Sequence, residues 1–174
     1  MVTLLAALLL LQGDAPQFAA LQDFQKRVSD YVKFENNLAK GSSVNKPTDE
    51  PHLILERQHE LARKIREGRS QAKEGDIFTA AISKEFRRLL GIAMAGGNNV
   101  GIQKSLAHSE PVHLALHVNE SYPADVPLQS TPPTILINLP RLPPELEYRI
   151  DGHALVLRDT AANLVIDLIP NAIP

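Results

Sequence analysis

Three of the six histidines in this chain lie in one short stretch, HSEPVHLALHVNE, at residues 108–120. Histidine and glutamate side chains bind transition metals and transfer protons near neutral pH. In a helix, His113 and His117 would share one face four residues apart, which is the spacing found in zinc-binding helices. His108 and Glu110 then complete a candidate metal site, of the kind that suits a small metal-binding protein or a metal-dependent hydrolase.

A strand over the same residues places these histidines too far apart to share an ion. Apolar residues alternate without a break from Val112 to Val118, which is the period of a strand. Residues four apart in a strand are separated by roughly 13 Å, whereas a ligand nitrogen lies about 2 Å from its metal. The alternation favours a strand over 112–118 with solvent-facing histidines and no bound cofactor. The metal site is the alternative.

No other stretch carries a recognisable catalytic motif. The sequence has no cysteine, which excludes disulfides, thiolate catalysis and zinc sites built on cysteine. A Gly-x-Ser-x-Gly nucleophile motif is absent, and Gly96 and Gly101 lack the Lys-Ser/Thr pair that a phosphate loop requires directly after its second glycine. Turn formation and solubility explain Asp151, Asp159 and Asp167 at the predicted strand ends. We therefore assign no catalytic residue.

The composition narrows the class of partner. The chain has 174 residues, 44% of them hydrophobic and 22% charged, which is typical of one globular domain. A formal net charge of −2 argues against a nucleic-acid partner held by phosphate neutralisation. Tryptophan is absent and aromatic residues make up only 5%, so stacking surfaces for single-stranded nucleic acid are scarce. The expected partner is another protein or a component of the cell envelope.

Residues 1–15 are predicted to be a signal peptide. The apolar run from Val2 to Leu11 is too short to span a bilayer but suits a signal-peptide core, and Gly13 and Ala15 are small residues before a cleavage point. No basic residue precedes the run, so a hydrophobic helix packed into the fold is the alternative. Export of a protein without cysteine favours a bacterial periplasmic or secreted location, with no stable membrane span after cleavage.

Three amphipathic helices are predicted in the region 16–110, where apolar residues recur every three or four positions. They are expected over 17–40, over 51–67, and from Asp76 or Thr79 to Gly91. The residues expected to face the core are Leu21, Phe24, Val28, Tyr31, Leu38, Ile54, Leu61, Ile65, Ile82, Phe86, Leu89 and Leu90. A glycine-rich connection follows the third helix.

The region 111–174 is predicted to contain a β-hairpin. The dipeptide Asp151-Gly152 favours a two-residue turn, because both central positions of a type I′ turn need positive φ. Counting outward from this turn gives the pairs Ile150 with His153, Tyr148 with Leu155, and Leu146 with Leu157. All six residues then lie on one largely apolar face, while the other face is mixed or charged.

A third strand is predicted over 164–169, with Leu164, Ile166 and Leu168 pointing inward, which completes a meander. One face of such a sheet must be covered, and the amphipathic helices are available for this. Seven prolines fall between Tyr122 and Glu145. Within this segment, STPPTILINLP is expected to form a short helix capped by Thr131.

Two segments resemble an uncharacterised group of exported bacterial proteins. They are AKEGDIFTAAISKEFRRLL, at 72–90, and LPPELEYRIDGHALVLRDTAANLVIDLIP, at 142–170. The resemblance implies a bacterial periplasmic or secreted setting, and it implies no activity or functional residue.

The sequence therefore predicts an α+β fold. N-terminal amphipathic helices pack on a C-terminal three-stranded antiparallel meander in one compact domain, with 112–118 as a candidate fourth strand. The expected function is that of a non-enzymatic exported protein that binds another protein or an envelope component. The alternative is a metal-binding protein or metal-dependent hydrolase that uses the 108–117 histidine cluster.

Overall fold

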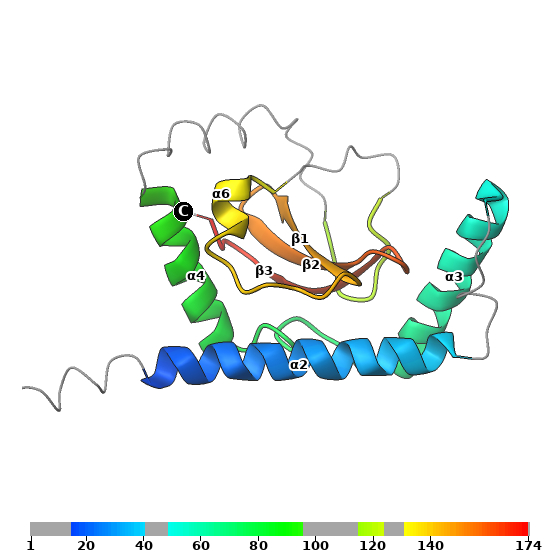
Figure 1. Cartoon of the computed structure of the whole chain (residues 1–174), viewed down its shortest axis with the longest axis horizontal. Helices are drawn as coiled ribbons and strands as arrows, with labels where there is room; N and C mark the ends of the chain where they lie inside the picture. The colour runs from blue at the N-terminus through cyan, green and yellow to red at the C-terminus, as the bar shows by residue number, and fades with distance from the viewer. Residues whose placement is uncertain (1–14, 41–48, 96–114, 124–130, 174) are drawn as a thin grey trace, which may run out of the picture.

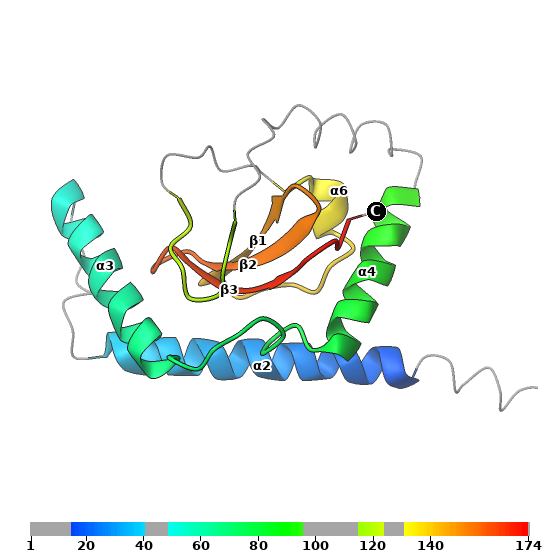
Figure 2. The ribbon, with the colours of Figure 1, turned by 180° about the vertical axis from the view of Figure 1, so that it is seen from behind.

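A computed structural model describes residues 15–40, 49–95, 115–123 and 131–173. Its helices are α2 (Ala15–Ala39), α3 (Pro51–Gly68), α4 (Ala80–Ala95) and the short α6 (Pro133–Leu136). Its strands are β1 (Leu146–Asp151), β2 (Ala154–Asp159) and β3 (Leu164–Ile169), which form an antiparallel sheet in the order β1-β2-β3. Helix α2 runs along one side of this sheet, and α3 and α4 extend from its two ends (Figures 1 and 2). The predicted α+β fold is confirmed.

Helix α2 follows the apolar spacing of its sequence. Phe24, Val28 and Tyr31 are buried against the core, and Leu21 and Leu38 are partly buried beside it. Residues three or four apart lie on one face of a helix, so this spacing gives α2 a single core-facing stripe. No helix in the described ranges is both long and apolar enough to span a bilayer.

Helices α3 and α4 match their predicted positions but differ at two points. Leu61 and Ile65 of α3 are buried, whereas Ile54 is 50% exposed because the first half of α3 extends beyond the sheet (Figure 1). Helix α4 continues past Gly91, its predicted end, to Ala95. Its apolar face continues through Ala93 and Met94, both buried, and this packing extends the helix.

The β1–β2 hairpin has the predicted apolar face but a different register. Asp151 pairs with Ala154 and Ile150 with Leu155, so the turn consists of Gly152 and His153 instead of Asp151 and Gly152. Gly152 has φ of 55°, and a glycine at the first turn position is the preference of a type II′ turn. The shift moves every partner by two residues, which keeps each side chain on its predicted face.

A β-bulge in β3 changes which of its residues face the helices. Asp167 pairs with Leu157, while Val165 pairs with Arg158, which leaves Ile166 as an extra residue. Leu164 and Ile166 belong to the main core as predicted. The prediction for Leu168 is wrong, because beyond the bulge it packs on the opposite face of the sheet.

The opposite face of the sheet is covered by residues 115–123. Leu116 and Tyr122 from this segment pack with Leu168 and its neighbours Val156 and Val165. The predicted strand over 112–118 is not formed in its described part, 115–118, which is neither strand nor helix. A turn at Val118 and Asn119 follows, and only Ser121 makes an isolated bridge to β3.

Arg66, in the last turn of α3, and Arg69, directly after that helix, hold Asn119 in a conformation that a strand does not have. The Arg66 guanidinium donates to the carbonyl of Asn119, and the side-chain amide of Asn119 donates to the carbonyl of Arg69. Asn119 itself has φ of 68°, outside the range of a strand. Backbone hydrogen bonds join residues 119–122 to Asn163 and Val165 at the start of β3, so the segment lies beside that strand over a short length only.

The proline-rich segment contains the predicted short helix, α6, with a different role for Thr131. Pro132 occupies the N-cap position. The Thr131 hydroxyl instead donates a 2.8 Å hydrogen bond to the carbonyl of Tyr148. Thr131 therefore ties the start of this segment to the outer edge of β1.

Asp159 and Asp167 are fully buried, which corrects their assignment to solubility. The Asp167 carboxylate accepts N–H bonds of 2.7–3.0 Å from Gly75, Ile77 and Phe78 in the loop before α4. Asp159 accepts 2.6 Å and 2.7 Å bonds from the Tyr31 hydroxyl and the Ala162 N–H. Buried carboxylates are stable in a fold when donors of this kind satisfy them.

We expect Asp167→Asn to destabilise the protein by about 3 kcal/mol, because an amide nitrogen then faces N–H donors that have no other acceptor. Urea unfolding at neutral pH measures this change. Asp49→Asn makes the same chemical change at an exposed position and is the control. Equal unfolding midpoints for the two variants would show that the carboxylate does not hold the loop.

Candidate functional site: a cationic groove along α2

Most of the predicted histidine site lies outside the described residues. This is the case for His108, Glu110 and His113. His117 is described and exposed, in the segment before the turn at Asn119. Within the described ranges, no group of three histidine, aspartate or glutamate side chains is arranged to hold a metal ion. The metal site therefore stays a prediction.

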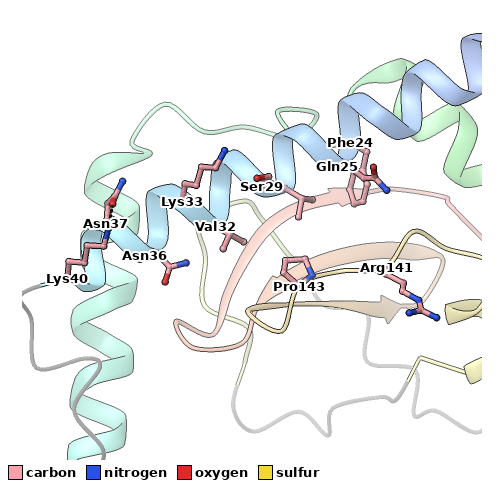
Figure 3. A pocket seen from close by; sticks show the side chains of 11 residues that line it. Phe24, Gln25, Ser29, Val32, Lys33, Asn36, Asn37, Lys40, Arg141 and Pro143 are labelled. Atoms are coloured by element: carbon pink, nitrogen blue, oxygen red, sulfur yellow. Dashed lines mark hydrogen bonds between the residues drawn. The ribbon is translucent and has the colours of Figure 1, made fainter.

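A groove lies between α2 and the segment before β1 (Figure 3). We call it the α2 groove, and its volume is about 570 Å³. Figure 3 shows α2 on one side and Arg141 and Pro143 on the other. Its lining residues are Phe24, Gln25, Val28, Ser29, Val32, Lys33, Asn36, Asn37, Lys40, Arg141 and Pro143.

The floor of the α2 groove is apolar. Phe24, Val28 and Val32 follow one another at intervals of four residues, so they form a row along α2, and Pro143 lines the opposite side. Asn36 and Lys40 continue the same row, which spans roughly 24 Å of helix from Phe24. Phe24 and Val28 are also core residues. The floor is therefore held rigidly by the packing that holds α2 itself.

Among the described residues that line the α2 groove, every charged side chain is a cation. The Lys33 Nζ atom lies 3.8 Å from a carboxylate oxygen of Asp30. Lys40 donates a 3.1 Å hydrogen bond to the side-chain oxygen of Asn37. Arg141 is exposed and has no ion pair or hydrogen bond with any residue in the described part of the chain. A free guanidinium beside an apolar floor is suited to a carboxylate or phosphate ligand group.

A second groove of about 470 Å³ lies on the other side of Arg141, along β1. Its one acidic lining residue, Glu147, is bonded to the guanidinium groups of Arg149 and Arg158. Burial opposes ionisation of Glu147, but the two arginines outweigh it and lower its pKa. Arg141 is therefore the charged group in this second groove that has no described partner.

A group of acidic residues lies on the core-facing side of α2. Asp159 and Glu145 are close enough to Glu35 to affect its ionisation, and we call these three residues the buried acidic cluster. Glu35 is only 5% exposed, and its Oε2 atom has no hydrogen-bond partner in the described structure. Burial, with the charges of Asp159 and Glu145, raises the pKa of Glu35 to about 8.

The partners of Asp159 have perturbed ionisation as well. Burial raises the pKa of Asp159, although the hydrogen bonds from Ala162 and Tyr31 act in the opposite direction. Burial and the neighbouring Asp159 raise the pKa of Tyr31 well above its usual value. The Tyr31 hydroxyl therefore stays protonated and donates to Asp159.

The sequence analysis predicted neither the α2 groove nor the buried acidic cluster. The apolar stripe of α2 includes the position of Glu35, four residues after Tyr31, and that spacing was the available signal for a buried acid. The α2 groove had no such signal. It depends on residues 141–143 lying beside α2, and no local pattern relates two segments that are about a hundred residues apart.

The buried acidic cluster predicts a stability that falls as pH rises. A protonated native Glu35 stabilises the fold fully below its unfolded pKa, and this contribution is lost as pH rises through about 8. Between these values the free energy of unfolding falls by about 1.4 kcal/mol per pH unit. Urea unfolding from pH 5 to pH 9 measures the slope. In Glu35→Gln the slope should be smaller, and parallel profiles for the two proteins would contradict the assignment.

Comparisons of this chain with protein-family models, with curated proteins and with solved structures find no match. The resemblance of 72–90 and 142–170 to a group of exported bacterial proteins stays an expectation. What the chain does has to follow from the chemistry of the α2 groove and of the buried acidic cluster.

Proposed function

We propose that this protein is a non-enzymatic, exported bacterial binding protein whose ligand is an anionic amphiphile, a single acyl chain that ends in a carboxylate. The α2 groove carries the proposal, because its floor is apolar and the charged residues in the described part of its lining are cations. An amphiphile of this kind is a component of cell envelopes, which agrees with the class of partner expected from the sequence.

The size of the α2 groove supports a small ligand over a protein partner. Its volume of about 570 Å³ lies within the range of roughly 300–1,000 Å³ that is typical of small-molecule sites. Val28 and Val32, with Pro143 opposite them, offer a narrow apolar track along a helix. Its wall is a helix with internally bonded backbone groups, so an extended peptide has no strand edge to pair with there.

The charges of the α2 groove support an anionic head group. Arg141 is free to form a bidentate pair with a carboxylate, and Lys33 and Lys40 add positive potential along α2. A cationic amphiphile would be repelled by the same three side chains. An uncharged one would gain the apolar contacts alone.

Binding of decanoate to the full chain tests the proposal, with decyltrimethylammonium as a probe of similar chain length and opposite charge. Isothermal titration calorimetry should show saturable binding of decanoate at one site and much weaker binding of the cation. Equal binding of both probes would contradict a charge-selective groove. Binding of an oligo-glutamate peptide in place of decanoate would show that the partner is an acidic protein segment.

Arg141→Gln should weaken decanoate binding about fivefold, the effect of losing an exposed ion pair worth about 1 kcal/mol. Lys84→Gln removes a cation from an exposed position on α4, outside the α2 groove, and should leave the affinity unchanged. The dissociation constants of the three proteins are measured in the same buffer. Equal losses in both variants would assign the effect to overall charge and not to the groove.

Ser29→Glu should weaken decanoate binding more strongly, because it places a carboxylate on the wall of the α2 groove at an exposed position. Ser29→Gln has a side chain of similar size without the charge and is the matched control. Calorimetry compares the two, with circular dichroism to show that both fold. Unchanged affinity in Ser29→Glu would place the ligand elsewhere.

A further inference from the structure

Glu35 is a buried acid that nothing in the proposed binding chemistry uses. It lies on the core-facing stripe of α2, is 5% exposed, and leaves Oε2 without a hydrogen-bond partner in the described structure. A buried polar atom without a partner is costly and is rarely kept without a role. The unpaired Oε2 atom therefore suggests that the protonation state of Glu35 has a function.

Ionisable groups from several elements lie around Glu35 or its neighbours. Tyr31 comes from α2 itself, Asp159 from the end of β2, and Glu145 from the residue before β1. Arg69, after α3, lies with its guanidinium 5.2 Å from the centre of the Tyr31 ring. That guanidinium donates to Asn119 and to the carbonyl of Ile166.

No cation in the described ranges forms an ion pair or hydrogen bond with Glu35, Glu145 or Asp159. A protonated Glu35 is neutral and adds no charge to the buried acidic cluster. An ionised Glu35 adds a negative charge beside two other acids in a buried setting, which is strongly unfavourable without a paired cation. Exposure of the ionised carboxylate to water would remove this cost, and because Glu35 lies on the core-facing stripe of α2, such exposure would displace the second half of that helix.

The second half of α2 also forms one wall of the α2 groove. Val32 precedes Glu35 by three residues, and Asn36 follows it directly; both line the groove. Pro143 lies opposite them on the segment that leads to Glu145, and Arg141 lies farther along that segment (Figure 3). A displacement of α2 around Glu35 therefore separates the two walls that would hold the ligand.

We propose that Glu35 is a proton-controlled latch, which in its protonated form holds the second half of α2 on the sheet and keeps the α2 groove closed around its anionic ligand. This inference rests on the proposed function for its ligand, and on the buried acidic cluster for its mechanism. The groove binds tightly when the latch is protonated and weakly when it is ionised.

Decanoate binding to the full chain between about pH 6 and about pH 9 tests the latch. The decanoate carboxylate keeps its charge over this interval, so the probe itself does not titrate. We expect the affinity of the wild-type protein to fall at least tenfold, about one factor of ten for each pH unit above the latch transition. In Glu35→Gln, which imitates the protonated form, the affinity should stay within about twofold.

Glu74→Gln makes the same chemical change at an exposed position and should follow the wild-type profile. Glu145→Gln removes one negative neighbour of Glu35, so ionisation becomes easier and the loss of affinity should begin at lower pH. A Glu35→Gln profile that falls in parallel with the wild type would overturn the latch. An unchanged profile in Glu145→Gln would overturn the role of the buried acidic cluster.

Hydrogen exchange separates failure of the latch from failure of the proposed function. Protection factors of amides 31–39 in α2 should fall between about pH 6 and about pH 9 in the wild type and stay constant in Glu35→Gln, whereas amides 82–94 in α4 should show no such difference. If these shifts occur without decanoate binding at any pH, the latch stands and the ligand is wrong. If protection in α2 does not depend on Glu35, the latch is wrong whatever the ligand.

Discussion

The carboxylate of Asp167 joins the helical part of this protein to its sheet. It accepts N–H bonds from Gly75, Ile77 and Phe78, and a further 2.8 Å bond from the Leu168 N–H. The loop that it holds begins α4 and follows α3, so one side chain on β3 positions the connection between both helices. Because the carboxylate is fully buried, losing a donor leaves a desolvated charge, and the loop and the strand can only adopt their positions together.

The hydrophobic pattern predicted the elements of this fold but not the polar contacts that orient them. The bounds of α3 and the buried stripe of α2 followed from helical spacing. The core face of the hairpin was predicted correctly although its turn was not, because the observed register differs from the predicted one by two residues. The burial of Asp159 and Asp167 was missed. Each carboxylate resembles a surface residue until its donors are known, and Tyr31 lies 128 residues from Asp159 along the chain.

The candidate site shows the same limit for a different reason. Its cations were visible in the sequence as solvent-facing residues of α2, and Arg141 as part of a proline-rich segment. These cations line a groove only because the segment 141–143 lies beside α2, so that one face of the helix becomes a wall of that groove. Glu35 sits within the same two turns of helix as Val32 and Asn36, so the surface that would meet a ligand and the surface that meets the core belong to one rigid element.

Residues 172 and 173 have a consequence for the timing of folding. Their N–H groups both donate to the carbonyl of His153 at the hairpin turn, and their side chains are buried in the same core as Ala20 and Phe24. The core therefore closes with contacts between segments about 150 residues apart, and such long loops are slow to form. During synthesis, α2 emerges long before the strands that complete its core, so the nascent chain stays open and accessible to chaperones until those strands have left the ribosome.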